Sequence, residues 1–213
     1  MEFLKVVQGR HSIRSFQNKT IARSDLEQIL HAAAKSPSWV NAQEWKVYVA
    51  TGKTLEVIKA EYTPRSRGGE EGHSEVKTSH RETFSTVAQQ NMAALGSLIE
   101  QKGIGSEFSN SQHIMYNAPA IMVFCVPKNA GEFTILDLGG FYQSAMLTAC
   151  DLGIGSIPSY NIIKYPEILR KHLNISDDYK IVIGVAFGYA DDSELNRFVP
   201  DRMPLDKFAV FCD

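Results

Sequence analysis

Two uninterrupted apolar runs constrain the fold of this chain more than any other feature. The first covers residues 120–126 (AIMVFCV) and the second covers residues 180–189 (KIVIGVAFGY). Apolar runs of this length without polar alternation are typical of strands that are buried on both faces. A helical pattern over residues 134–152 lies between the two runs and stops at a Gly-Ile-Gly sequence. The sequence therefore predicts a buried sheet with helices on both of its faces.

Further elements can be placed around this sheet. Short strands are expected at residues 46–50 and 156–158, so the sheet is small. Ser24 is followed by Glu27 three residues later, which predicts a helix that is capped at Ser24 and ends near Pro37. The fold class is thus α+β, in a single domain of residues 1–213 whose polar, glycine-bearing stretch 61–82 is expected to form a lid or insertion. The other expected helices are residues 3–9, 53–60, 84–102 and 166–173.

The composition excludes several classes of protein. The 213 residues carry a net charge of -2 with both signs interspersed, so neither nucleic acid nor a membrane is expected as the main partner. The three cysteines form no CxxC pair and the six histidines share no ligand spacing, so no metal site is predicted. The sequence shows no signal-peptide pattern and no apolar run of transmembrane length, and we expect a cytoplasmic protein.

A short basic segment, residues 10–16 (hereafter the arginine stretch), is the strongest candidate for a binding site. Arg10, Ser12 and Arg14 stand two residues apart, so their side chains share one face of an extended chain. Two guanidinium forks beside a hydroxyl suit a phosphate or the polar edge of a planar heterocycle. A solvated basic turn is the alternative that the spacing alone leaves open. The sequence lacks nucleophile-elbow, P-loop, zinc-protease and kinase motifs, which favours a protein whose cofactor does the chemistry.

Together with the arginine stretch, motifs elsewhere in the chain resemble the nitroreductase family of FMN-dependent NAD(P)H oxidoreductases. The similarity lies in R-x-S-x-R-x-F from residue 10, S-P-S-x-x-N-x-Q-x-W from residue 36, D-x-G from residue 137, G-Y at residue 188 and R-x-P-L from residue 202. These motifs follow the family's order over most of the chain. The resemblance implies a nitroreductase-like fold, with a small central mixed sheet flanked by helices and a C-terminal tail exchanged in a dimer.

The resemblance also implies roles for individual residues. In such proteins the arginine stretch contacts the FMN phosphate, ribityl chain and pyrimidine edge, and a C-terminal arginine reaches the phosphate. The loop that begins at Ser36 approaches the flavin from the other subunit. The segment after Gly155 lies along the isoalloxazine ring, and a backbone N–H near Tyr160 is a candidate partner of flavin N5. The implied cofactor-binding residues are Arg10, His11, Ser12, Arg14, Pro37, Ser38, Asn41, Asn110, Pro158, Ser159, Tyr160, Arg197 and Arg202.

The implied activity is ping-pong transfer of hydride from NAD(P)H, through flavin N5, to a nitroaromatic, quinone or similar acceptor, in a homodimer with FMN at the subunit interface. No side chain is expected to be catalytic. Two alternatives stay open: an FMN carrier or sensor without nitroreductase turnover, and a specialised flavin enzyme of the same family. Trp39, Glu44 and Pro200 depart from the family pattern, which leaves the acceptor and the choice between NADH and NADPH open. Trp45 and Phe16 are expected in the core rather than against the flavin.

Overall fold

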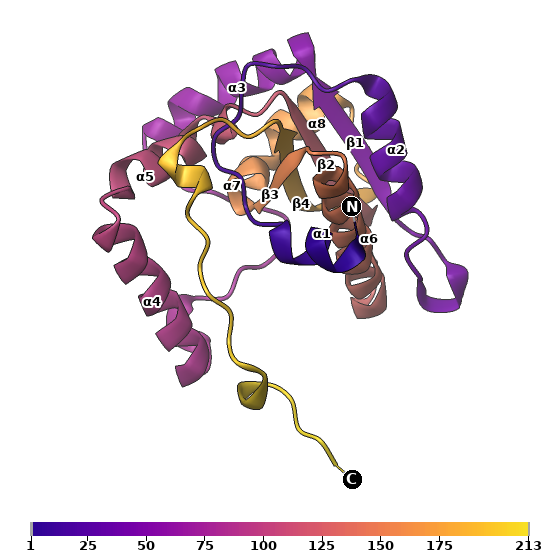
Figure 1. Cartoon of the computed structure of the whole chain (residues 1–213). Helices are drawn as coiled ribbons and strands as arrows, with labels where there is room; N and C mark the ends of the chain where they lie inside the picture. The colour runs from indigo at the N-terminus through magenta and orange to yellow at the C-terminus, as the bar shows by residue number, and fades with distance from the viewer. Residues whose placement is uncertain (1, 213) are drawn as a thin grey trace.

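The computed structural model describes residues 2–212 and contains one four-stranded sheet (Figure 1). The strands lie in the order β1 (Lys46–Thr51), β2 (Ala120–Pro127), β4 (Tyr179–Gly188) and β3 (Gly155–Ser159). All three pairings between these strands are antiparallel, and a parallel bridge outside them joins residue 12 to residue 156. The predicted α+β class is confirmed, and the sheet is mixed only through that bridge.

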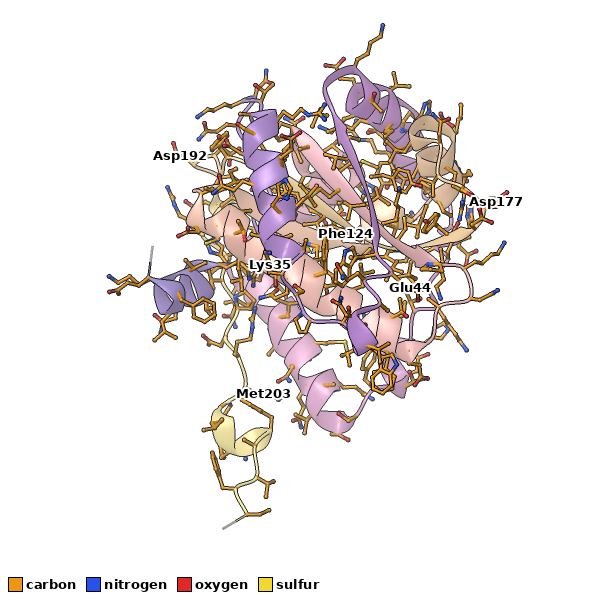
Figure 2. All side chains as sticks on the ribbon, turned by 90° about the vertical axis from the view of Figure 1, so that its right-hand side faces the viewer. Lys35, Glu44, Phe124, Asp177, Asp192 and Met203 are labelled. Carbon is orange, nitrogen blue, oxygen red and sulfur yellow. The ribbon has the colours of Figure 1, made fainter. Side chains whose placement is uncertain are left out.

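The central strand β2 explains the first apolar run of the sequence. Successive side chains of a strand point to opposite faces. Ile121, Val123 and Cys125 join the core on one side of the sheet, whereas Met122 and Phe124 belong to the core on the other side. All five side chains are fully buried, and Figure 2 shows Phe124 in the middle of the molecule. A strand that buries both faces needs apolar residues at every position, so the continuous run follows from its central place.

Helices cover both faces of the sheet. The side that receives the odd-numbered residues of β2 carries α3 (Gly52–Arg67), α7 (Tyr160–Ile163) and α8 (Pro166–Leu173). The opposite side carries α2 (Arg23–Ala33) and α6 (Glu132–Asp151), which also pack against each other. The sheet thus lies between two helical layers, as its apolar strands require.

Two segments extend away from these cores. The helix α4 (Thr86–Gln101) has no buried residue, and the chain after Pro200 is exposed along nearly all of its length. In Figure 1 both project from the body on the side where α1 (Phe3–Gly9) lies, and α5 (Gly105–His113) follows α4 in the chain. Figure 2 shows the tail around Met203 standing clear of the rest. Among the described residues 2–212, no helix is long and apolar enough to cross a membrane.

Most of the expected elements are confirmed, and the differences have physical causes. The helix α2 has its N-cap at Ala22, so the predicted cap at Ser24 is wrong, and no side chain caps the first turn. The helix α3 continues to Arg67 because Tyr62 and Ser66 are buried on its inner face. The segment without helix or strand is therefore residues 68–80 rather than the whole of the expected 61–82 stretch, and the short helix α5 was not predicted.

Candidate cofactor site

The arginine stretch runs along the outer edge of β3. Ser12 bridges Ser156, and the Ile13 N–H donates to the Ser156 carbonyl at 3.0 Å. The Ile13 side chain is buried over Gly155, where an added Cβ would lie only 2.6 Å from it. Because alternate residues of an extended segment point to opposite sides, the half-buried Ser12 and Arg14 face away from the core. The pairing with β3 thus turns the polar face of the stretch away from the core.

The close approach at Gly155 gives a first prediction. Gly155→Ala should lower the free energy of unfolding by about 1–3 kcal/mol, because the new methyl group overpacks against Ile13 and pushes the arginine stretch off β3. Urea unfolding measures the change. Gly131→Ala is the matched control, since a Cβ there meets nothing within 4 Å. Combining Gly155→Ala with Ile13→Ala should cost less than the sum of the two single changes, and strict additivity would contradict the clash.

Asn196, which the sequence did not single out, fixes the backbone of the arginine stretch. Its side-chain oxygen accepts hydrogen bonds from the backbone N–H groups of Arg14 at 2.8 Å and Ser15 at 3.1 Å. Its side-chain nitrogen donates to the Ser15 carbonyl at 2.7 Å and to the Asp191 carboxylate at 3.0 Å. Its backbone carbonyl lies 2.9 Å from Nε2 of His11. Asn196 is buried, so one side chain satisfies backbone groups from which water is largely excluded.

The Arg14 guanidinium is held by two aromatic rings. It lies 5.0 Å from the ring centroid of Phe108 and 5.2 Å from that of Phe198, and it donates to the Ser12 carbonyl at 3.1 Å. Burial lowers the pKa of Arg14. Cation–π contacts orient a guanidinium without using all of its five N–H groups. Arg14 is therefore positioned in advance and retains donors for a bound group.

Within the described residues 2–212, Arg10 and Arg202 have no carboxylate ion-pair partner, and each lies within range of the other's positive charge. Burial lowers the pKa of Arg10, and the nearby positive charge of Arg202 lowers it further. The Arg202 guanidinium donates to two backbone carbonyl oxygens. Two like charges with no counter-charge favour a bound anion. Arg197 differs from both, because its guanidinium forms an ion pair with Glu194.

A cavity of about 200 Å³ lies beside Arg10 and is lined also by His11 and Ser156. The Ser156 hydroxyl is buried and has no hydrogen-bond partner within the described part of the chain. A buried polar group without a partner costs about 1–3 kcal/mol, so native proteins rarely leave one unused. An oxygen-rich group in this cavity would satisfy the hydroxyl. Together with the two arginines, the residues present fit the phosphate and ribityl oxygens of FMN.

The residues expected along the flavin ring, Pro158, Ser159 and Tyr160, lie where β3 ends and α7 begins. The Ser159 hydroxyl lies 2.7 Å from the hydroxyl of Tyr116 and accepts a hydrogen bond from the backbone N–H that follows Tyr160. Burial raises the pKa of Tyr116, and the charge of Arg14 acts on it in the opposite direction. Tyr116 thus contacts the end of β3 and lines the same cavity as Arg14 of the arginine stretch.

Asn110, expected as a flavin contact, lies on α5 beside a second cavity of about 210 Å³. Arg14, Ser111 and Tyr116 line the same cavity, which supports a role for this part of α5. The Asn110 side chain itself is exposed and accepts a hydrogen bond from Arg67 at 3.3 Å. Ser111 and Tyr116 were not predicted, because neither belongs to a recognisable motif.

The loop expected to reach the flavin of a second subunit lies apart from these groups. Within residues 2–212, no hydrogen bond or ion pair joins residues 36–43 to the arginine stretch. The loop is ordered internally, since the Ser38 hydroxyl accepts from the Gln43 N–H at 3.1 Å. Pro37 and Asn41 are exposed, and Asn41 adopts a left-handed conformation with φ of 58°. Within one chain, residues 36–43 therefore do not contribute to the site.

The expected core positions of two aromatic residues are confirmed. Phe16 is buried, and Trp45 packs against Phe141 with ring centroids 4.7 Å apart. Trp39, one of the departures from the family pattern, instead lies on the surface, where it stacks on Phe133 at 4.9 Å. The stacking of Trp39 on Phe133 buries part of each ring against the other.

Comparisons with known proteins identify the class to which this fold belongs. The crystal structure of the FMN-dependent nitroreductase NfnB from Mycobacterium smegmatis in complex with NADPH superposes with a TM-score of 0.90. The two chains are 23% identical, and the match covers 99% of this chain and 97% of that chain. This likeness shows a common fold. The model of the nitroreductase family matches residues 7–189, and the chain therefore belongs to the nitroreductase family.

Curated relatives extend over nearly the same length. A 4-nitrobenzoate reductase from Pseudomonas putida is 24% identical over 206 residues, which cover 90% of this chain and 87% of the relative. The nitroreductase NfnB from Mycolicibacterium smegmatis is 26% identical over 199 residues, which cover 89% and 83% respectively. The expected family and fold are thereby confirmed.

Proposed function

We propose that this chain is an FMN-dependent oxidoreductase that uses NAD(P)H to reduce nitroaromatic compounds, quinones or related acceptors. The observation that carries the proposal is the like charge of Arg10 and Arg202, which form no ion pair within the described residues 2–212, together with the unsatisfied Ser156 hydroxyl beside Arg10. Membership of the nitroreductase family supports it, and so do relatives named as reductases of 4-nitrobenzoate and as an FMN-dependent nitroreductase bound to NADPH.

The chemistry that FMN would supply when bound is two-electron transfer through its ring. The residues of the chain would bind and orient it. Arg10 and Arg202 would hold the phosphate, Ser12 and Ser156 would bond to ribityl oxygens, and Arg14 would face the polar edge of the ring. Of the other expected contacts, His11 lies beside the phosphate position and Pro158, Ser159 and Tyr160 lie toward the ring. The buried hydroxyl of Tyr116 would keep the Ser159 end of β3 in place.

In the proposed reaction, donor and acceptor occupy the same place in turn. One cycle converts a nitro group, NAD(P)H and a proton into a nitroso group, NAD(P)⁺ and water. The proposal assigns no catalytic role to a side chain, and the chain would contribute by placing the reactants. Segment 68–80, expected as part of a lid, is anchored to the body, because the Glu75 carboxylate accepts hydrogen bonds from the Arg170 side chain and from the Ile181 N–H.

The proposed form is a homodimer with the cofactor at the interface. Large apolar side chains are exposed on α1 and in the tail, with Phe3 at 69%, Phe208 at 63% and Phe211 at 77% of full exposure. Apolar surface of this extent is unusual on a monomer and is typical of an interface. A second subunit that covers it would also bring Pro37, Ser38 and Asn41 to the site. We further propose a single domain that works in the cytoplasm, in keeping with three free cysteines.

Truncation of the tail tests the dimer. A chain that ends after Pro204 should dissociate more readily, because it lacks the exposed apolar residues Leu205, Phe208 and Phe211. Sedimentation velocity over a range of protein concentrations measures the shift toward monomer. The full-length variant Phe208→Glu with Phe211→Glu keeps the chain length and should show the same shift. A sedimentation profile equal to that of the unchanged protein would contradict the role of the tail.

Colour tests the function itself. The purified protein should be yellow, should bleach under anaerobic conditions when NADH or NADPH is added, and should recover its colour when a nitroaromatic acceptor follows. Yellow protein that neither coenzyme bleaches would favour an FMN carrier or sensor. Protein that is colourless and binds no added FMN would refute both functions. Comparison of the two bleaching rates by stopped flow would establish the preferred donor.

A further inference from the structure

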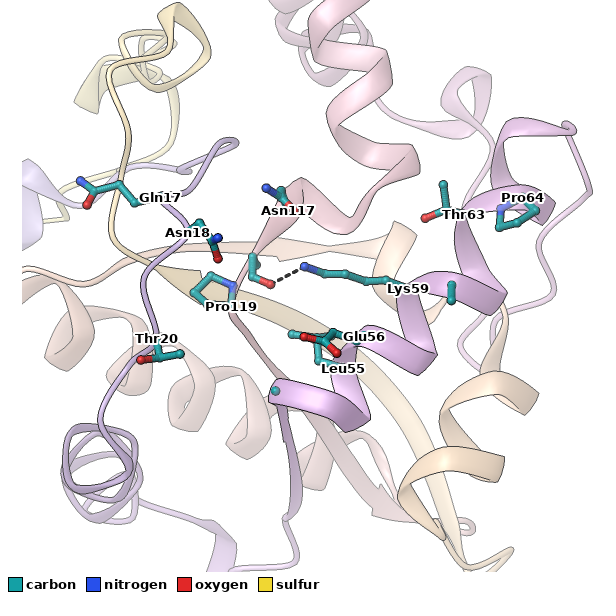
Figure 3. A pocket seen from close by; sticks show the side chains of 13 residues that line it. Gln17, Asn18, Thr20, Leu55, Glu56, Lys59, Thr63, Pro64, Asn117 and Pro119 are labelled. Atoms are coloured by element: carbon teal, nitrogen blue, oxygen red, sulfur yellow. Dashed lines mark hydrogen bonds between the residues drawn. The ribbon is translucent and has the colours of Figure 1, made fainter.

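A cavity of about 620 Å³ lies between α3, the residues that follow the arginine stretch and the segment that leads into β2 (Figure 3). In the described part of the chain, none of the residues proposed to bind the cofactor lines it. Leu55, Ala60, Pro64, Ala118 and Pro119 form the apolar parts of its wall, and amide, hydroxyl and charged side chains line much of the rest. The proposed reaction gives this cavity no role.

Lys59 is the cation of this cavity. Its Nζ donates to the carbonyl of Ala118 at 2.6 Å, and its side chain is half-buried. An ammonium group has three N–H donors, so two remain after this bond. Burial lowers the pKa of Lys59 to about 8, and Glu56 acts in the opposite direction. Among the described residues that line the cavity, Glu56 and Lys59 are the only charged ones, and no ion pair joins them.

Several polar side chains in the cavity wall have no protein partner. Asn18, Thr20, Thr63 and Asn117 make no side-chain hydrogen bond within the described residues 2–212, and all four line the cavity. Figure 3 shows them around the bond between Lys59 and Ala118. A cluster of free amide and hydroxyl groups beside a cation and an apolar wall is typical of a small-molecule site.

We propose that this cavity is a second ligand site, which binds a small molecule with one carboxylate and a short apolar body. The carboxylate accepts hydrogen bonds from the two free N–H groups of Lys59 and from the Asn117 amide, and the apolar body rests on Leu55 and Pro119. A phosphate is disfavoured, because it carries nearly two charges at neutral pH, whereas one half-buried ammonium faces it and Glu56 repels it.

Binding of such a ligand is coupled to the proton on Lys59. A carboxylate within hydrogen-bond reach favours the ammonium form, so the bound ligand raises the pKa of Lys59. Affinity is then highest at a pH below the pKa that Lys59 has in the ligand-free protein, because the amine is already charged there. It falls as the pH rises through that pKa, by at most about tenfold per pH unit, because one proton is linked to binding.

The experiment uses butyrate as the probe and the full-length chain as purified, with its cofactor. An aliphatic acid is chosen because it does not stack on an aromatic ring system. The Cε resonance of Lys59, in protein with ¹³C-labelled lysine, reports its titration, and Lys59→Met identifies that resonance. Butyrate should move the midpoint to higher pH, whereas butyramide, the neutral isostere, should not. A midpoint that saturating butyrate leaves unchanged, or that butyramide shifts equally, would overturn the proposal.

Glu56 provides a second, independent test. Glu56→Gln removes the like charge beside the proposed carboxylate, and it should tighten butyrate binding several-fold at a pH well below the pKa of Lys59, where the amine is charged in both proteins. Glu100→Gln removes an exposed carboxylate that does not line the cavity and serves as the matched control. If both variants bind butyrate with equal affinity, the carboxylate does not lie beside Lys59 and the proposal fails.

Discussion

We expect the double variant Arg10→Ala with Arg202→Ala to lose FMN during purification. Each change removes charge-assisted hydrogen bonds to the phosphate, which contribute about 1.5–3 kcal/mol per arginine. The dissociation constant should therefore rise about ten- to a hundredfold for each single variant. Titration of apoprotein with FMN, followed by the quenching of flavin fluorescence, measures the constant. Affinity should also fall with added salt, and less steeply in the double variant than in the unchanged protein.

Arg197 offers the matched control for this prediction. It lies five positions before Arg202, but its guanidinium forms an ion pair with Glu194. Arg197→Ala should thus leave FMN affinity nearly unchanged, although the family resemblance includes this arginine among the cofactor contacts. If Arg197→Ala weakens FMN binding as much as Arg202→Ala does, the phosphate is bound by Arg197 as well as by Arg10 and Arg202. Unchanged affinity in the double variant would refute the assignment of the phosphate position.

Asn196→Ala should have the largest effect on stability among changes at the site. The variant leaves the backbone N–H groups of Arg14 and Ser15 without their acceptor in a half-buried segment. Each unsatisfied donor costs about 1–3 kcal/mol, and the loss of two should be visible in urea unfolding as a clearly lower midpoint. FMN affinity should fall as well, because the arginine stretch loses its fixed backbone.

Asn110→Ala is the control for that change, since Asn110 is exposed and makes one long hydrogen bond to Arg67. It should shift the unfolding midpoint little. Asn196→Asp separates the two roles of the amide, because a carboxylate keeps the acceptor for the Arg14 and Ser15 N–H groups but loses the donor to the Ser15 carbonyl and to Asp191. An Asn196→Ala variant as stable as the unchanged protein would show that water replaces these bonds without cost.

The elements that local patterns define could be predicted well. The strand β2 was recognisable because both of its faces are buried, and α6 because small and apolar residues recur at helical spacing until glycine ends it. The arginine stretch was recognisable because alternation in an extended segment places three polar groups on one face. Each of these signals lies within about twenty consecutive residues, so no tertiary information was needed.

Features that depend on distant contacts could not be predicted. Asn196 acts on residues about 180 positions away, and nothing in its own neighbourhood marks it. Ser24 matched a capping pattern, but the helix α2 begins at Arg23 with its N-cap at Ala22, so Ser24 lies inside the helix. The extension of α3 to Arg67 rests on the burial of Tyr62 and Ser66, which overrides the breaking tendency of Pro64.

The position of the arginine stretch has a further consequence. It covers the outer edge of β3, where Ser12 bridges Ser156 and Ile13 donates to the same residue. An uncovered strand edge presents backbone groups that can pair with another chain. Cleavage of the chain near the exposed Gly9, or loss of the bonds from Asn196, would therefore do more than abolish binding. It would open an aggregation-prone edge, so damaged molecules would self-associate instead of persisting in solution as inactive protein.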